Sequence, residues 1–131
     1  MYMDLYRDLI LDHYRNPRNF GVLEKAECTI QEANTSCGDT ISMGFIFDHK
    51  QDVLCIKDIR FNGEGCAISQ ASASLLTEEV KGKPVEIVLS MKLTNILEML
   101  GTTLTPSRVK CALLPLEIIQ KAILVKLGRE S

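Results

Sequence analysis

Residues 41–61 read ISMGFIFDHKQDVLCIKDIRF and contain two apolar runs joined by a short polar link. The first run, 41–47, has an apolar side chain at every second position, which is typical of a strand with one buried face. The second run, 53–61, is also strand-like, and its alternation predicts that Ile56 lies on the opposite side from Ile59. The link DHKQD is short enough for a hairpin. With a shorter mixed run at 28–33, these segments predict a three-stranded antiparallel sheet.

The remaining segments are predicted to be mainly helical. Helical spacing of apolar residues predicts helices at 2–14 and 66–80, and two short helical pieces within 85–100. Residues 101–110 are expected to form a loop. Pro115 then fits the first turn of a last helix, whose inner stripe is Leu116, Ile119, Ile123 and Leu127. We find no repeat and no domain boundary, so we expect one α+β domain over residues 1–131.

Composition excludes several classes of protein. The 131 residues fit one domain, and the net charge of −2 comes from 15 basic and 17 acidic residues, without the basic and aromatic strip of a nucleic-acid binder. Neither a secretory leader pattern nor an 18-residue apolar stretch is found, so we expect a cytoplasmic protein with no membrane partner. In that compartment the five cysteines are expected to remain unpaired. Metal binding or thiol chemistry is then the first explanation for the presence of five cysteines.

Three of the cysteines lie at junctions between predicted elements. Cys37 is in the turn that enters a strand, Cys66 is where a glycine-rich turn enters a helix, and Cys111 is where a loop enters a helix. The N-terminal end of a helix stabilises a thiolate, which is the form that binds metals. Lys110 adds a positive charge beside Cys111.

The stretch TSCGDT, residues 35–40, adds a carboxylate to these thiols. Cys37 and Asp39 are two positions apart, so their side chains point the same way if the backbone is extended. Glycines beside the cysteines allow close backbone approach, at Gly38, Gly63 and Gly65. Three thiolates and one carboxylate suit tetrahedral zinc, whereas an iron–sulfur cluster normally takes four thiolates. An oxygen ligand in a sulfur site indicates a site that releases what it holds.

Simpler structural explanations apply to other residues and remain alternatives at the site. Asp39 could be a turn-forming residue with no ligand role, and any single cysteine could be a small buried hydrophobic residue. We keep the structural explanation for two strand cysteines, for both histidines and for two helix serines: Cys28, Cys55, His13, His49, Ser72 and Ser74.

Four sequence segments together resemble one known family. They are DHYRNPRNFG (12–21), TSCGD (35–39), GEGCAISQASASLLTEEVKGK (63–83) and RVKCALL (108–114), in that order. With them the chain resembles the U-type iron–sulfur assembly proteins, which include IscU, SufU and the front part of NifU. The resemblance covers about residues 5–127. It implies a three-stranded sheet with helices packed on one face and the three cysteines clustered at one end.

The resemblance also implies a site and partners. It implies metal or cluster ligands at Cys37, Asp39, Cys66 and Cys111, which would hold a [2Fe–2S] cluster or iron, or Zn²⁺ as an alternative occupant. A pyridoxal-phosphate cysteine desulfurase of the IscS, SufS or NifS type would deliver sulfur as a persulfide. The sulfur acceptor is Cys111 by the IscU-like precedent or Cys37 by the SufU-like one. Iron–sulfur proteins in their apo form would receive the product.

The sequence combines features of two branches of this family. Lys110 stands where IscU-like members commonly have a histidine, and this matches SufU-like members. The gap of 45 positions between Cys66 and Cys111 matches the compact IscU-like arrangement instead. A chaperone is a further possible partner, although residues 104–108 keep only part of the IscU Leu-Pro-Pro-Val-Lys motif.

Two functions follow from this mixture. The first is a non-enzymatic scaffold that receives sulfur, binds iron and builds a transferable [2Fe–2S] cluster. The alternative is a zinc-dependent sulfur-transfer protein that serves a desulfurase, and a purely structural zinc domain is a third option.

Overall fold

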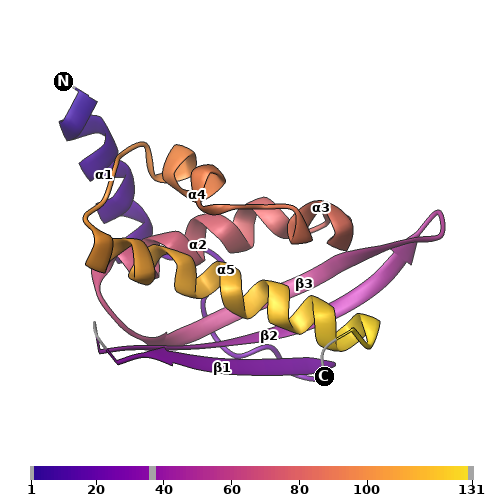
Figure 1. The fold of residues 1–131 in the computed structure, drawn as a ribbon. Helices are drawn as coiled ribbons and strands as arrows, with labels where there is room; N and C mark the ends of the chain where they lie inside the picture. Colours follow the sequence, from indigo (N-terminus) through magenta and orange to yellow (C-terminus); the bar gives the residue numbers. More distant parts are fainter. Residues whose placement is uncertain (1, 36–37, 130–131) are drawn as a thin grey trace.

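The three strands form one antiparallel sheet in the order β1-β2-β3, and the helices lie together on one face of it (Figure 1). The computed structural model describes residues 2–35 and 38–129, with side chains from residue 7 onward. The predicted α+β fold is confirmed. In chain order the elements are α1 (Tyr2–Arg15), β1 (Cys28–Asn34), β2 (Asp39–Lys50), β3 (Val53–Glu64), α2 (Ala67–Val80), α3 (Val85–Leu89), α4 (Leu93–Leu100) and α5 (Pro106–Leu127).

The predicted hairpin is present as β2 and β3, but one residue of β3 changes its alternation. The pairing between the strands shifts between Ile46 and Phe47, where Lys57 is an extra residue in β3. The bulge reverses the side on which the following residues lie, so Ile56 is fully buried in the same core as Ile59. The prediction that these two residues lie on opposite sides is therefore wrong.

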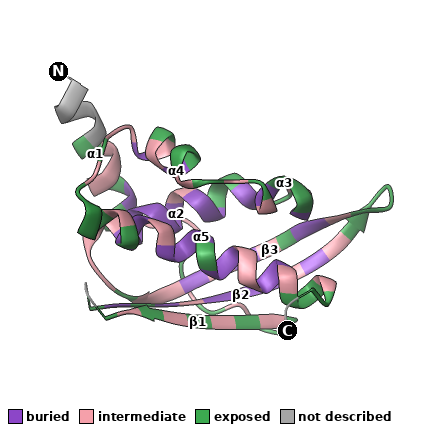
Figure 2. Ribbon diagram, viewed as in Figure 1, coloured by how far each residue is buried: buried purple, intermediate pink, exposed green. Residues whose placement is uncertain are grey.

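The core lies between the sheet and the helices, with α2 at its centre. Figure 2 shows buried residues along α2 and on the sides of α5 and the sheet that face it. Ala71 and Ala73 of α2 are fully buried, and α2 packs against α1, α5, β3 and α4. Such close packing on several sides needs the small side chains of the run AISQASAS. Three residues of the predicted inner stripe of α5 are buried, Leu116, Ile119 and Ile123, and Leu127 is half-buried.

The last helix starts earlier than the sequence analysis predicted. Residues 106–110, expected in a loop, form the first turns of α5. Thr105 is its N-cap residue and Pro106 its first residue, a position where the missing N–H of proline costs nothing. Pro115 therefore lies inside the helix rather than in its first turn. The two short helices expected within residues 85–100 are confirmed as α3 and α4. Within residues 2–35 and 38–129, none of the helices combines the length and hydropathy needed to cross a membrane.

The connector between α1 and β1 covers part of the sheet face that the helices leave open. Gly44 lies between the buried residues Met43 and Phe45 of β2, so its Cα hydrogen points away from the helices. A Cβ at Gly44 would lie 3.2 Å from the Cβ atoms of both Leu23 and Ala26. The connector therefore packs directly on the backbone of β2.

Candidate metal centre

The structure brings three of the four predicted ligand residues together. Asp39 is the first residue of β2, Cys66 precedes α2 as its N-cap residue, and Cys111 lies in α5. One ligand atom from each residue lies within 4.8 Å of the others. Cys37, the fourth predicted ligand, lies outside the described residues.

Asp39 links β2 to the N-terminal end of α2. The side chain is almost completely buried, and its Oδ1 accepts a hydrogen bond of 2.8 Å from the backbone N–H of Cys66. That N–H belongs to the end of a helix, where backbone donors lack partners within the helix. The other oxygen, Oδ2, lies 3.9 Å from Sγ of Cys66. Asp39 therefore fixes the backbone at Cys66 with one oxygen and keeps the other beside the sulfur, which a simple turn residue would not do.

Two glycines allow this approach. A Cβ at Gly63 would collide with the backbone oxygen of Thr40, and the φ of Gly63 is +141°. A Cβ at Gly65 would lie 2.6 Å from Oδ1 of Asp39 and 2.5 Å from Oγ of Ser69. Both contacts are shorter than real Cβ atoms make, so the turn between β3 and α2 can lie against Asp39 only without these side chains. The expectation that glycines permit close approach is confirmed at these two positions.

The backbone between Cys37 and Asp39 differs from the expectation. Gly38 has a φ of +72°, in the left-handed region, and no atom within 4 Å of a Cβ built there. Glycine is thus needed at this position for backbone conformation and not for space. The extended backbone assumed for this stretch is wrong, so the argument that the side chains of Cys37 and Asp39 point the same way no longer holds.

Cys66 occupies the position that the sequence predicted for it. It is half-buried and precedes α2, so the partial positive charge of the helix end lies beside its sulfur. Ser69 is a neighbour that the sequence analysis missed. Its Oγ lies 3.9 Å from Sγ of Cys66 and donates a hydrogen bond of 3.1 Å to the carbonyl oxygen of Cys66. The spacing of three residues at a helix start was the available signal.

Cys111 lies deeper in its helix than predicted. It is the sixth residue of α5, because the helix starts at Pro106, and its side chain is fully buried. The argument that a helix end stabilises its thiolate is therefore wrong, since the effect falls off within the first turn. Lys110, directly before it, is exposed. The Sγ atom of Cys111 lies 3.6 Å from the carbonyl oxygen of Ser107.

The oxidation states of the described cysteines are not uniform. Cys28, Cys55 and Cys66 are free thiols, whereas Cys111 is disulfide-bonded. The expectation that all cysteines are unpaired is therefore wrong for Cys111 in this structure. A metal needs the thiolate, so Cys111 can act as a ligand only after reduction.

The two strand cysteines are not part of this group of ligand atoms. Cys55 is buried in β3, and Cys28 is half-buried against the hydrophobic core. Burial raises the pKa of the Cys28 thiol, and the negative charge of Glu27 raises it further. A raised pKa disfavours the thiolate, which supports the structural interpretation of Cys28.

The histidines and helix serines also have structural positions. His13 is buried, and its Nδ1 shares a hydrogen bond of 2.7 Å with Oγ of Ser74. Oγ of Ser72 donates to the carbonyl oxygen of Ala112 at 2.8 Å, which joins α2 to α5. His49 is exposed near the end of β2. The expectation that these four residues are structural agrees with these contacts.

The geometry of the described group fits a tetrahedral metal. Zinc–sulfur and zinc–oxygen bonds of about 2.3 and 2.0 Å place neighbouring ligand atoms about 3.5–3.8 Å apart. The distance of 3.9 Å between Oδ2 of Asp39 and Sγ of Cys66 is close to that range. Because all three ligand atoms lie within 4.8 Å of one another, they need to approach by only about 1 Å at most. Two sulfurs and one oxygen are donors that zinc accepts, and the sulfurs also suit an iron–sulfur cluster.

Comparison with known proteins assigns the chain to a family. Residues 5–130 match the NifU-like N terminal domain. The chain belongs to this family. It is 38% identical to the zinc-dependent sulfurtransferase SufU of Bacillus subtilis, over 91% of this chain and 89% of that protein. It is 42% identical to the iron–sulfur cluster assembly scaffold protein IscU of Aquifex aeolicus, over 95% of this chain and 79% of that protein.

Solved structures of NifU-like proteins have the same fold. A putative iron–sulfur cluster assembly scaffold protein for the SUF system from Fervidobacterium islandicum superposes with a TM-score of 0.71. It is 30% identical, and the match covers 88% of this chain and 94% of that one. A NifU-like N-terminal protein from Brucella abortus gives a TM-score of 0.75 over 99% of this chain and 100% of that one. Its identity of 18% supports the fold alone.

Proposed function

We propose that this NifU-like protein is an iron–sulfur cluster assembly scaffold and that Cys37, Asp39, Cys66 and Cys111 hold its cargo. The observation that carries the proposal is the convergence of ligand atoms from Asp39, Cys66 and Cys111 within 4.8 Å. These residues come from three elements that only the folded chain brings together. IscU-named relatives such as that of Aquifex aeolicus support the same function.

Each residue has a defined task in this proposal. The cysteine thiolates bind iron and sulfide as cargo, and Asp39 supplies the one hard oxygen ligand. The backbone N–H of Cys66 already holds Oδ1 of Asp39, so Oδ2 is the oxygen available to the cargo. A single oxygen donor among sulfurs is the ligand that an acceptor displaces most readily, which makes the cargo transferable.

Sulfur delivery in this proposal comes from a pyridoxal-phosphate cysteine desulfurase. The thiolate of Cys111 or Cys37 attacks the outer sulfur of the desulfurase persulfide, one S–S bond forms as another breaks, and no net oxidation occurs. Each transferred sulfur must then gain two electrons to become sulfide, so cluster building also requires an external one-electron donor protein. An apo iron–sulfur protein accepts the finished [2Fe–2S] cluster.

Zinc-dependent sulfur transfer is the second candidate function. It is favoured by Lys110, which matches the SufU-like branch, and by the relative named a zinc-dependent sulfurtransferase. The same four residues would hold Zn²⁺, and one cysteine would leave the metal to accept the persulfide sulfur. Transfer of that sulfur to a second thiol or to a scaffold ends the cycle without net reduction.

Metal content after anaerobic, reducing purification separates the two functions. A scaffold gives a brown protein with iron and acid-labile sulfide after incubation with desulfurase, cysteine, Fe²⁺ and an electron donor. A colourless protein that keeps one zinc ion and raises desulfurase turnover contradicts the scaffold proposal and supports sulfur transfer. Cys66→Ser is expected to lose the metal in either case, and retention of metal by this variant would contradict the ligand assignment.

An Asp39→Cys variant tests the task of the oxygen ligand. A four-sulfur shell holds zinc or a cluster longer, so transfer to an apo-acceptor is expected to slow while retention on the protein rises. Asp39→Ala removes the ligand without replacing it and is expected to shorten retention. An Asp39→Cys variant that delivers its cargo as fast as the original protein rules out Asp39 as the release point.

A further inference from the structure

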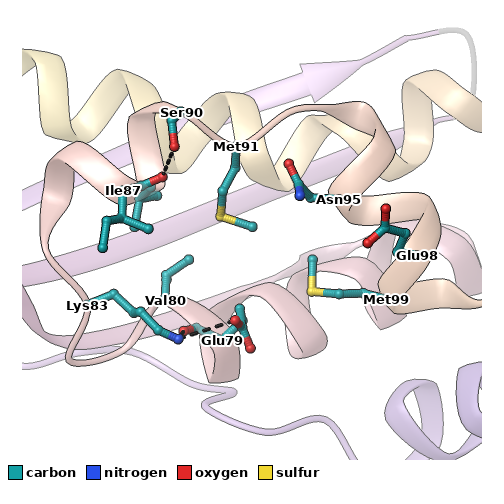
Figure 3. A pocket seen from close by; sticks show the side chains of 10 residues that line it. Glu79, Val80, Lys83, Ile87, Ser90, Met91, Asn95, Glu98 and Met99 are labelled. Atoms are coloured by element: carbon teal, nitrogen blue, oxygen red, sulfur yellow. Dashed lines mark hydrogen bonds and ion pairs between the residues drawn. The ribbon is translucent and has the colours of Figure 1, made fainter.

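A hollow of about 470 Å³ lies between the C-terminal end of α2 and the helices α3 and α4. Val80 and Val88 form its buried floor, and Figure 3 shows Met91 and Met99 pointing into it. Ile87 lies at its edge and is 53% exposed. The hollow thus offers an apolar interior that water reaches and no described side chain fills.

The hollow is far from the candidate metal centre. Cys66 precedes α2, whereas Glu79 and Val80 are its last residues. With a rise of about 1.5 Å per residue, these positions lie roughly 20 Å apart along the helix. An occupant of the hollow therefore leaves the metal centre accessible.

Most polar groups at the rim of the hollow already have partners. Lys83 forms an ion pair of 3.2 Å with Glu79, and Oγ of Ser90 donates to the carbonyl oxygen of Ile87 at 2.6 Å (Figure 3). Oδ1 of Asn95 accepts a hydrogen bond of 2.8 Å from the backbone N–H of Lys92. Each of these residues therefore already has a polar partner within the protein.

Glu98 differs from the other rim residues. Its side chain is exposed, and within the described part of the chain its carboxylate takes part in no ion pair or hydrogen bond. Because Lys83 neutralises Glu79, the rim carries one uncompensated negative charge beside the apolar interior. Such a site complements a positive charge placed next to an apolar group.

We propose that this hollow docks a partner-protein segment that presents an apolar side chain next to an arginine or lysine. The apolar side chain inserts between Met91 and Met99, whose flexible thioether chains adapt to its shape. The neighbouring cation pairs with Glu98. The volume is in the range of pockets that take small ligands, so one or two side chains fill it.

Methionine-methyl NMR tests this docking site with three synthetic tetrapeptides. The probes are acetyl-Ala-Leu-Arg-Ala-amide, the same peptide with Glu for Arg, and the same peptide with Ser for Leu. The Leu-Arg peptide is expected to shift the methyl signals of Met91 and Met99 at millimolar concentration and to bind about fivefold more tightly than the Leu-Glu peptide. Met43 is fully buried in the sheet core and serves as the internal control that stays unchanged.

Two variants with the same charge change complete the test. Glu98→Gln is expected to abolish the preference for the basic peptide, whereas Glu78→Gln, an exposed position on α2 outside the hollow, keeps it. The proposal is overturned if Met91 and Met99 do not respond up to about 10 mM peptide. It is also overturned if the three peptides act alike, or if Glu98→Gln retains the preference. Added zinc should not change the result, so the outcome is independent of the proposed cluster function.

Discussion

The two ends of α2 are built in opposite ways. The N-terminal end is held by hydrogen bonds from Asp39 and Ser69 to the backbone of Cys66. The chain can approach so closely there because Gly63 and Gly65 have no Cβ atom. At the C-terminal end, apolar side chains from α2, α3 and α4 meet around a hollow of about 470 Å³. One end is crowded and polar, and the other is open and apolar.

This difference shows how one helix can serve a rigid site and an adaptable surface. The position of Cys66 depends on backbone contacts that tolerate no added carbon atom, so small changes there are costly. The methionine-lined end has free space and flexible side chains, so changes there are expected to cost little. The predictions below start at the crowded end of α2 and run from the largest expected effect to the smallest.

Gly63→Ala is expected to have the largest effect on the free energy of unfolding. The added Cβ collides with the backbone oxygen of Thr40, which cannot move without breaking the pairing of β2 with β3. A loss of more than about 4 kcal/mol, or failure to fold, is expected. Urea unfolding followed by circular dichroism measures this loss.

Gly128→Ala is the matched control for that variant. Gly128 also has a positive φ, +72°, but no atom lies within 4 Å of an added Cβ. Only the left-handed backbone conformation is penalised, and a loss of about 1 kcal/mol is expected. Equal losses in the two variants would show that backbone conformation, and not contact with β2, determines the cost at Gly63.

Metal removal is expected to have the next largest effect. In the reduced protein the thiolates of Cys66 and Cys111 lie close to each other and to the carboxylate of Asp39, and a bound cation relieves their repulsion. A metal that binds only the folded state at a thousandfold excess over its Kd stabilises that state by about 4 kcal/mol. The melting temperature of the reduced protein should therefore fall when a chelator removes zinc. Identical melting curves with and without chelator would exclude a stabilising metal.

The sequence predicted the sheet and the site better than it predicted the exact course of the chain. The hairpin and the clustering of Asp39 with Cys66 and Cys111 were expected, because alternation and the family motifs are local signals. The bulge at Lys57 could not be predicted, since apolar residues occur in both alternating sets of residues 53–61 and the sequence does not show where the buried set changes. It depends on the packing of β3 against the helices, which no short window of sequence contains.

The start of α5 was missed for a different reason. Thr105 and Pro106 form a recognisable helix start, but the polar run around them favoured a loop. Pro115 then gave a second, misleading start signal. Burial of Cys111 on the core side of the helix makes the longer helix favourable, and tertiary packing of this kind overrides local signals. The left-handed backbone at Gly38 was missed as well, because it involves one residue and so forms no repeating pattern in the sequence.

The paired variant Cys28→Ala with Cys55→Ala is expected to affect stability and not metal binding. Cys28 packs against the hydrophobic core and Cys55 is buried, but both lie outside the group of ligand atoms. Removing one buried and one half-buried sulfur should lower the free energy of unfolding by about 1–2 kcal/mol. Metal stoichiometry, measured by mass spectrometry of the native protein, should stay unchanged. Loss of metal in this variant would contradict the assignment of Cys66 and Cys111 as the ligands among the described cysteines.

The smallest predicted effect concerns the middle of α2, where Ser74 bonds to the buried His13. Burial lowers the pKa of His13 below its ordinary value of 6.5, and the charge of Arg18 lowers it further, while Glu78 and Asp12 act in the opposite direction. The unfolded chain therefore takes up a proton at higher pH than the folded protein does. The contribution of neutral His13 to stability is complete above pH 6.5 and is lost as the pH falls through that value towards the folded pKa.

The free energy of unfolding should consequently decrease below pH 6.5, by no more than about 1.4 kcal/mol per pH unit from this one group. His13→Gln keeps a side chain that can bond to Ser74 but does not titrate, so its unfolding free energy should depend less on pH between 7 and 5.5. The exposed His49→Gln is the matched control and should keep the original dependence. If His13→Gln and the original protein show the same dependence, the titrating group lies elsewhere, and the polar pair in the middle of α2 contributes packing alone.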